Sequence, residues 1–134
     1  MATRSGSVDP GAVLYLLRER LLTEEKVERA LEHESGLAGL SGGGSGDVRE
    51  ASPLALDVFV HRVVGAVASM AAACGGIDVL AFTGGIGEHA DEIRDRIVER
   101  ARFLGDFRSE VVPAREELVI AAETRSLLER RVTS

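Results

Sequence analysis

The stretch from residue 53 to residue 83 limits the possible folds more than any other part of the sequence. From Pro53 onward, apolar residues recur at the spacing of one helix face: Leu56, Val60, Val63, Val67 and Met70. Pro53 suits the first helical position, and the glycine pair at 75 and 76 ends the helix. The run Ile-Asp-Val-Leu-Ala-Phe-Thr at 77–83 then predicts a short, buried strand. A long helix that leads directly into a strand indicates an α/β fold.

Helical patterns flank this unit on both sides. Asp9 and Pro10 predict the start of a helix that runs to Leu21, and Thr23 caps a second, charged helix. Beyond the strand, the apolar spacing predicts a helix over residues 93–104, a short strand at 111–112 and a final helix over residues 115–131. Two strands are too few for a complete sheet.

Residues 35–50 are rich in glycine and serine, and we expect no regular structure there. By composition alone, such a segment is most often a flexible linker. Leu37 and Leu40 near its start, and Asp47, Val48 and Arg49 near its end, indicate an anchored loop instead. The sequence leaves both interpretations open.

A second glycine-rich segment follows the predicted strand, and we expect residues 83–89, Thr-Gly-Gly-Ile-Gly-Glu-His, to form a turn. Glycine allows backbone angles and close approaches that a Cβ atom would prevent. Backbone N–H groups at the start of the next helix can bind an anionic or polar ligand. The spacing fits neither a Walker loop nor a Rossmann fingerprint. Taken alone, such a turn is more often structural than ligand-binding.

Composition narrows the functional classes. The chain has 134 residues, enough for one domain with one hydrophobic core. Its formal charge of −6 argues against nucleic-acid binding, which needs a basic face. The N-terminus has no signal-peptide pattern, and no apolar run is long enough to span a membrane. The single cysteine, Cys74, cannot form an internal disulfide, so we expect a soluble, cytoplasmic protein.

Four segments, in order along nearly the whole chain, resemble the signatures of the acetate kinases. They are residues 3–10 (Thr-Arg-Ser-Gly-Ser-Val-Asp-Pro), residues 35–49, residues 82–88 (Phe-Thr-Gly-Gly-Ile-Gly-Glu), and Pro113 with residues 116–121. This family of acetate, propionate and butyrate kinases belongs to the actin-like and sugar-kinase superfamily, with a ribonuclease H-like α/β fold. The resemblance implies that residues 1–134 form a single truncated C-terminal lobe of such a kinase, with the N-terminal lobe missing.

The resemblance also implies roles for individual residues. Arg4 matches an arginine that stabilises charge on the transferring phosphoryl group, a task suited to a planar guanidinium. Asp47, Val48 and Arg49 match a stretch that lines the adenosine end of the nucleotide. An arginine face can stack on a base, and an aspartate can accept hydrogen bonds from ribose or amine groups. Without the resemblance, Arg4 would be interpreted as a solvated side chain, and Asp47 with Arg49 as a surface ion pair.

The second glycine segment matches the adenosine motif of the family through Gly84, Gly85, Ile86, Gly87 and Glu88. His89 departs from the family, which usually has asparagine there, and an imidazole cannot copy both functions of an amide. Glu116 matches a glutamate that helps to hold Mg²⁺. Without the resemblance, Glu116 would be interpreted as favourable electrostatics in the first turn of a helix.

The implied activity is phosphoryl transfer between ATP and acetate, or another short-chain carboxylate, giving ADP and acetyl phosphate. The family would add Mg²⁺ as cofactor and a homodimer as assembly. The chain is shorter than the family pattern between residues 50 and 54 and between residues 104 and 111. The acyl pocket and several catalytic groups would belong to the missing lobe, so we expect the chain alone to be inactive. Two alternatives stay open: a remnant nucleotide-binding module, and a non-catalytic partner protein whose apolar faces form an interface.

Overall fold

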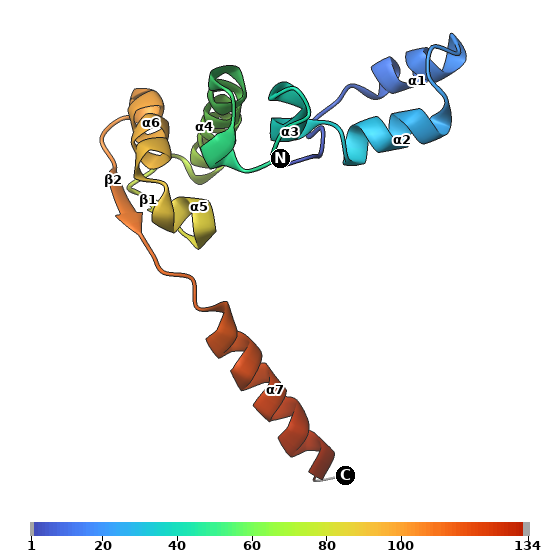
Figure 1. Ribbon diagram of the computed structural model, residues 1–134. Coiled ribbons are helices and arrows are strands. Elements are labelled where there is room, and N and C mark those ends of the chain that lie inside the picture. The colour runs from blue at the N-terminus through green and yellow to red at the C-terminus, as the bar shows by residue number, and fades with distance from the viewer. Residues whose placement is uncertain (1, 133–134) are drawn as a thin grey trace.

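The computed structural model describes residues 2–132, with side chains described up to residue 128. Helices make up most of the structure, and they accompany one small two-stranded sheet, as Figure 1 shows. In chain order the elements are α1 (Pro10–Arg18), α2 (Glu24–Glu32), α3 (Gly36–Leu40), η1 (Val48–Glu50), α4 (Pro53–Cys74), β1 (Val79–Phe82), α5 (Gly84–His89), α6 (Asp91–Ala101), η2 (Arg102–Leu104), β2 (Arg108–Val111) and α7 (Glu116–Val132). This order confirms an α/β chain.

Helix α4 organises the core. It packs chiefly against α6 and also against α3. Val60 and Ala55 on α4 are completely buried, and they belong to one cluster of buried apolar side chains: Leu37, Val48, Ala55, Val60, Val64, Ile93, Ile97 and Ala101. Since Val48 lies in this cluster, the segment before α4 is anchored to the same core as the segment after it.

The boundaries of α4 are those that the sequence predicts. The Ser52 hydroxyl accepts a bond from the Ala55 N–H at 3.3 Å, Pro53 occupies the first turn, and Gly75 ends the helix with a left-handed φ of 77°. Among the described residues, α4 alone is long and apolar enough to cross a membrane, judged by length and composition only. In this structure its buried side chains pack against α6 and α3.

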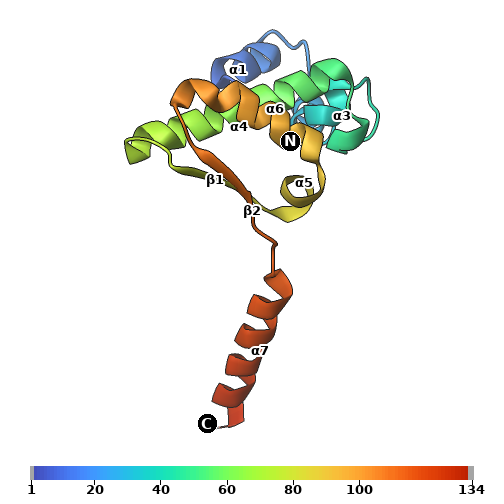
Figure 2. The same ribbon diagram turned by 90° about the vertical axis from the view of Figure 1, so that its left-hand side faces the viewer.

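Strands β1 and β2 form a parallel pair, with Val79 opposite Arg108 and Phe82 opposite Val111. Leu80 and Phe82 pack against the core cluster, but Val79 and Ala81 are exposed. The prediction of a buried strand is therefore wrong for one face. The reason is that α4 and α6 lie on the same side of the pair, as Figure 2 shows, and no described element covers the other side.

The first glycine-rich segment is more regular than predicted, because it contains α3 and η1. Leu37 and Ala38 are buried, and the Ala38 N–H donates to the Ala2 carbonyl at 3.0 Å. A Cβ atom on Gly39 would lie 2.5 Å from the Glu34 carbonyl oxygen, so this close approach requires glycine. These contacts exclude a flexible linker and support the anchored alternative.

Helices α1 and α2 extend from one side of the core and α7 extends from another, whereas the N-terminus itself lies beside α3 (Figures 1 and 2). Helices α1 and α2 begin at the predicted caps Asp9 and Thr23, although α1 ends at Arg18 rather than Leu21. Helix α7 is confirmed close to its predicted bounds. It projects into solvent, and all of its described side chains are exposed.

Candidate functional site

Two segments that are distant in sequence line one small cavity of about 340 Å³. One segment comprises residues 46–49, and the other comes from α5 and the residue that follows it. The lining residues are Gly46, Asp47, Val48, Arg49, Gly85, Ile86, His89 and Ala90. The structure therefore brings together most of the residues for which the sequence predicts contact with the adenosine end of a nucleotide.

Asp47 and Arg49 form a tight local pair at one side of this cavity. The Asp47 Oδ1 atom accepts bonds from the backbone N–H and from the Nε–H of Arg49, both at 2.9 Å. The Arg49 Nη2 atom also pairs with Asp47 Oδ2. The bonds from the Arg49 side chain, and then from its backbone, lower the pKa of Asp47 from 3.8 to about 2. Arg49 is itself 74% exposed, so its guanidinium face is open to a ligand.

The local fold explains this geometry. Asp47 caps η1, because its carboxylate accepts the Arg49 N–H, and Val48 points into the core with 3% exposure. The buried valine fixes the backbone between the two polar residues. The Asp47 N–H is in turn held by the Ser45 hydroxyl at 3.0 Å.

The other side of the cavity is α5, where the sequence predicts a turn and the structure has a short helix. Gly84 begins it with a left-handed φ of 72°. A Cβ atom on Gly87 would lie 3.2 Å from the carbonyl carbon of Phe82, so glycine lets the helix pack against the end of β1. The predicted turn is thus a helical turn held close to the strand that precedes it.

Glu88 stabilises α5 rather than lining the cavity. Its Oε1 atom accepts bonds from the Gly84 and Ala114 N–H groups, both at 2.9 Å. The first bond serves the start of α5, where the Thr83 side chain makes no cap. The second ties the segment after β2 to the same site.

Arg94 is a supporting residue that the sequence analysis missed. Its Nη1 atom donates to the Gly87 carbonyl at 2.9 Å, and its Nη2 atom donates to Asp91 at 2.6 Å. Only 17% of the Arg94 side chain is exposed. The sequence does hold a signal for this role: Arg94 is a cation in the first turn of the helix predicted after residues 83–89. A cation there is within reach of the last carbonyl groups of the glycine-rich segment.

Arg4 lies outside the cavity but in a segment that contacts it. Its Nε atom pairs with Glu32 at 3.0 Å, and its side chain is 76% exposed. The backbone around it is fixed by a bond of 2.9 Å from the Ser5 N–H to the Leu31 carbonyl. Ala2, two residues before Arg4, packs closely on Gly46: a Cβ atom added to Gly46 would lie 2.9 Å from the Ala2 Cβ.

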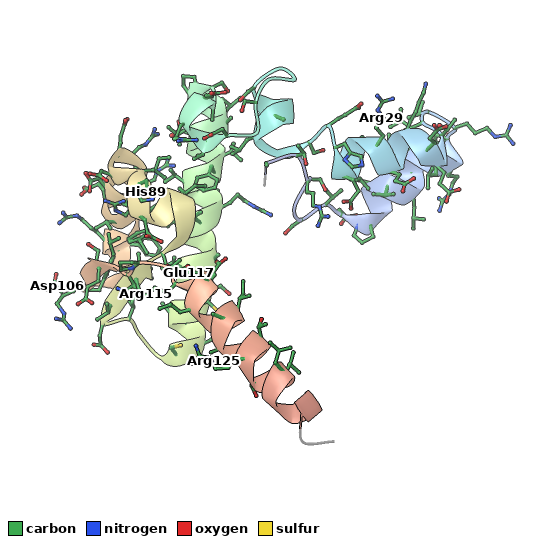
Figure 3. The ribbon with its side chains drawn as sticks, turned by 60° about the horizontal axis from the view of Figure 1, so that its bottom comes forward. Arg29, His89, Asp106, Arg115, Glu117 and Arg125 are labelled. Carbon is green, nitrogen blue, oxygen red and sulfur yellow. The ribbon has the colours of Figure 1, made fainter. Side chains whose placement is uncertain are left out.

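Glu116 is the first residue of α7 and does not join the cavity. Figure 3 shows its neighbours Arg115 and Glu117 at the start of this helix. Among the side chains that the structure describes, residues 2–128, no group of three or more His, Cys, Asp or Glu is arranged to hold a metal ion. Mg²⁺ often takes only one or two carboxylates and completes its shell with water and substrate phosphates. A single glutamate fits that mode but cannot form a metal site by itself.

The cavity can recognise a flat polar ring. It offers an exposed cation at Arg49, an apolar surface at Ile86, which is 41% exposed, and an imidazole at His89. Gly85, where an added Cβ atom would meet nothing within 4 Å, lets a ligand approach the backbone. The volume of the cavity is near the lower limit for sites that bind small molecules. A cavity of this size can hold one end of a larger ligand.

Comparisons with known proteins point to one family. The model of the acetokinase family matches residues 1–126. An acetate kinase of Rhodopseudomonas palustris is 48% identical over 112 residues, covering 78% of this chain and 28% of the relative. A crystal structure of the Porphyromonas gingivalis acetate kinase matches with a TM-score of 0.80 and 31% identity, over 96% of this chain and 40% of that one. A propionate kinase from Francisella tularensis matches with a TM-score of 0.79 and 31% identity, over 90% and 38%.

These matches cover only part of each relative. The chain spans 28–40% of the length of the curated acetate kinases that it matches. One such alignment extends over 161 positions, more than the 134 residues of this chain, so that relative has additional residues inside the matched region. This agrees with the shortening predicted from the sequence.

Proposed function

Because the chain belongs to the acetokinase family, we propose that it is the nucleotide-binding part of an acetate kinase-type phosphotransferase. Family membership supports a kinase-type function. Residues 1–134 would form one truncated C-terminal lobe of the actin-like fold. The observation that carries the proposal is the convergence of residues 46–49 and α5 on one cavity.

We propose that the adenosine end of ATP or ADP enters this cavity. The base would stack on the Arg49 guanidinium, which is planar and exposed. Asp47 is held in its charged form by Arg49 and would accept hydrogen bonds from the ribose. Ile86 and the glycine backbone would supply the apolar and close contacts, and His89 would donate one hydrogen bond.

The proposed reaction transfers the γ-phosphoryl group of ATP to a carboxylate. An oxygen of acetate, or of another short-chain carboxylate, forms a bond to the γ-phosphorus, and the bond from this phosphorus to the β,γ-bridging oxygen breaks. The products are ADP and an acyl phosphate. Arg4 would stabilise charge on the transferring group. Its pair with Glu32 does not oppose this role, because an ion pair between two exposed side chains contributes about 0–1 kcal/mol and a phosphate can replace the carboxylate.

Mg²⁺ would neutralise charge on the nucleotide phosphates when bound, with Glu116 as one ligand or as a partner of its water shell. Glu116 begins α7 and follows closely after Ala114, whose N–H donates to the Glu88 side chain of α5. We also propose a cytoplasmic location, since Cys74 is the single cysteine.

We further propose that the chain alone does not turn over. It spans less than half of its relatives, and phosphoryl transfer depends on positioning both substrates in a closed site. A remnant module that binds nucleotide without turnover is the second candidate, and it is favoured by the convergence of residues 46–49 and α5 on one cavity within this chain. Acetate and propionate are both candidate acceptors, because the similar structures include an acetate kinase and a propionate kinase.

Nucleotide binding is tested by titrating ATP and ADP into the full chain by calorimetry. Arg49→Ala should weaken binding roughly 2- to 30-fold, the range given by a cation–π contact of about 0.5–2 kcal/mol. Arg102→Ala is the matched control, because Arg102 is 72% exposed and pairs with nearby Glu99, but does not line the cavity. Equal losses in both variants would contradict the proposed adenosine site.

Turnover is tested by trapping acyl phosphate with hydroxylamine after incubation with ATP, Mg²⁺ and acetate. We expect no product from the chain alone. Robust product formation that is lost in Arg4→Ala would show that the chain is a complete enzyme and would refute the inactive-fragment proposal.

A further inference from the structure

Another small cavity, of about 310 Å³, lies between α4 and the N-terminal segment. Its lining residues are Ser7, His61, Arg62, Gly65 and Ala66, and we call it the basic cavity. It shares no lining residue with the cavity proposed for adenosine. Three of its five lining side chains can donate hydrogen bonds, and none is a carboxylate.

The four lining residues from α4 share one face of the helix. His61 and Gly65 are four positions apart, as are Arg62 and Ala66, so each pair lies together on the helix surface. Gly65 stands inside the helix, where glycine is less favourable than alanine. A Cβ atom added there would meet nothing within 4 Å. The missing side chain therefore leaves open space beside the two basic residues.

The guanidinium group of Arg62 reaches the N-terminal segment. A Cβ atom added to Gly6 would lie 3.5 Å from Arg62 Nη2, so this end of the arginine lies against the Gly6 backbone. Gly6 has a left-handed φ of 71°, which glycine adopts without strain. Ser7 follows directly, and its side chain borders the same cavity as Arg62. Donors from two distant segments thus face one space.

No described carboxylate compensates the charge of this cavity. Asp57 lies four positions before His61 on α4, but it pairs with Arg96 of α6 at 2.5 Å. Among the side chains described up to residue 128, neither His61 nor Arg62 makes an ion pair. The whole chain has a formal charge of −6, so a basic cavity without an acidic neighbour is an exception on its surface. Its charge favours an anionic ligand.

We propose that the basic cavity binds a phosphate group, either as the free ion or as part of a small phosphate ester. The planar guanidinium of Arg62 grips two phosphate oxygens. The Ser7 hydroxyl and an imidazole N–H of His61 donate hydrogen bonds to the others. A dianionic phosphate is attracted more strongly by the permanent charge of Arg62 than a carboxylate with one negative charge.

This site is distinct from the one proposed for phosphoryl transfer. Arg4, the residue proposed to stabilise the transferring group, pairs with Glu32 at 3.0 Å and does not line the basic cavity. The inference does not rest on the proposed function. Phosphate binding can be measured without nucleotide or Mg²⁺, and its failure would leave the proposed adenosine site untouched.

The test is an NMR titration of the full chain with inorganic phosphate at constant ionic strength. We expect saturable amide shifts at Ser7 and at residues 61–66. Glycerol phosphate is titrated as a phosphate ester, and acetate, which should bind several-fold more weakly, as a carboxylate. Tighter binding of the ester would assign the cavity to a phosphorylated small molecule, and tighter binding of the ion to free phosphate. Both results support the proposal.

Arg62→Gln should weaken phosphate binding roughly tenfold or more, because it removes the charged donor. Arg18→Gln is the matched control: Arg18 is also an exposed arginine on a helix and its loss changes the net charge equally, but it does not line the basic cavity. This control should bind phosphate within about twofold of the unmodified chain. Ser7→Ala should lose less affinity than Arg62→Gln, since it removes one neutral donor. All three residues are exposed, so none of these changes should unfold the chain.

Absence of saturable shifts at these residues would overturn the proposal. Equal loss in the two arginine variants would also overturn it, because the binding would then follow the net charge of the chain. Acetate that binds as tightly as phosphate would refute the phosphate assignment. Displacement of phosphate by ADP would assign the cavity to the nucleotide and would refute a separate site.

Discussion

Gly85→Ala separates nucleotide binding from stability more cleanly than any other single change. Gly85 lines the adenosine cavity, and a Cβ atom built on it meets no heavy atom within 4 Å. Its φ is outside the left-handed region, unlike the 72° of neighbouring Gly84, so alanine fits the backbone. Replacing a helical glycine by alanine at a compatible position stabilises a protein by about 0.4–1 kcal/mol. The chain should therefore become slightly more stable.

Nucleotide binding should change in the opposite direction. The new methyl group takes up space beside the cavity wall and replaces a close backbone contact, which we expect to weaken ATP and ADP binding on the order of tenfold, or about 1.4 kcal/mol. Gly65→Ala is the matched control: Gly65 lies inside α4, its added Cβ also meets nothing within 4 Å, and it is not part of this cavity. It should gain about 0.5–1 kcal/mol without loss of affinity.

The assay combines calorimetric titration of ATP and ADP with urea unfolding of the same samples. The decisive result is a Gly85→Ala variant that is at least as stable as the original chain and binds nucleotide less well. If it binds as tightly as the original chain, no ligand contacts this wall and the adenosine assignment is wrong. If Gly65→Ala loses affinity equally, the effect reports on helix stability rather than on the cavity.

Three further predictions follow from the packing and the pairs around the site. Val60→Ala should lower the free energy of unfolding by about 2–3 kcal/mol in urea titrations, because a completely buried side chain loses two carbon groups and leaves a cavity. In a carboxyl-detected NMR titration, Asp47 should have a pKa of about 2, and Arg49→Gln should return this pKa toward 3.8. Because the pKa of Asp47 is lower in the folded chain, the stabilisation by its pair with Arg49 is present above pH 3.8 and is lost as the pH falls toward 2. Glu88→Ala should speed amide exchange at its two backbone donors and cost on the order of 1–3 kcal/mol, with Glu88→Gln retaining part of the effect.

The sequence predicts those parts of the fold that depend on local signals. The caps at Asp9 and Thr23, the proline at the start of α4 and the glycine at its end act through neighbouring backbone groups, so their effect can be predicted without knowing the tertiary structure. The strand at 79–82 is recognised from its apolar run for the same reason. Its partial exposure could not be predicted, because burial depends on which elements cover the sheet.

The two glycine-rich segments show where local reasoning ends. Composition alone predicts irregular backbone in both, yet α3 and α5 are helical because distant groups complete them. The Ala2 carbonyl accepts a bond from α3, and Glu88 links the start of α5 to Ala114, 26 residues later. Neither partner is visible from glycine content. The convergence of residues 46–49 with α5 was accessible only through the family resemblance.

Helix α4 has more apolar surface than its neighbours in the structure cover. The second half of α4, from residue 63 to residue 74, has no charged side chain, and a helix that is apolar on all sides is normally covered on all sides. Here α4 packs against α3 and α6, but its second half also lines an open apolar groove of about 750 Å³ beside β1. The same composition makes α4 long and apolar enough to resemble a membrane-spanning helix. The sequence of α4 therefore specifies more apolar contact than the described elements supply, and the exposed part of that surface includes Met70, which is 61% exposed.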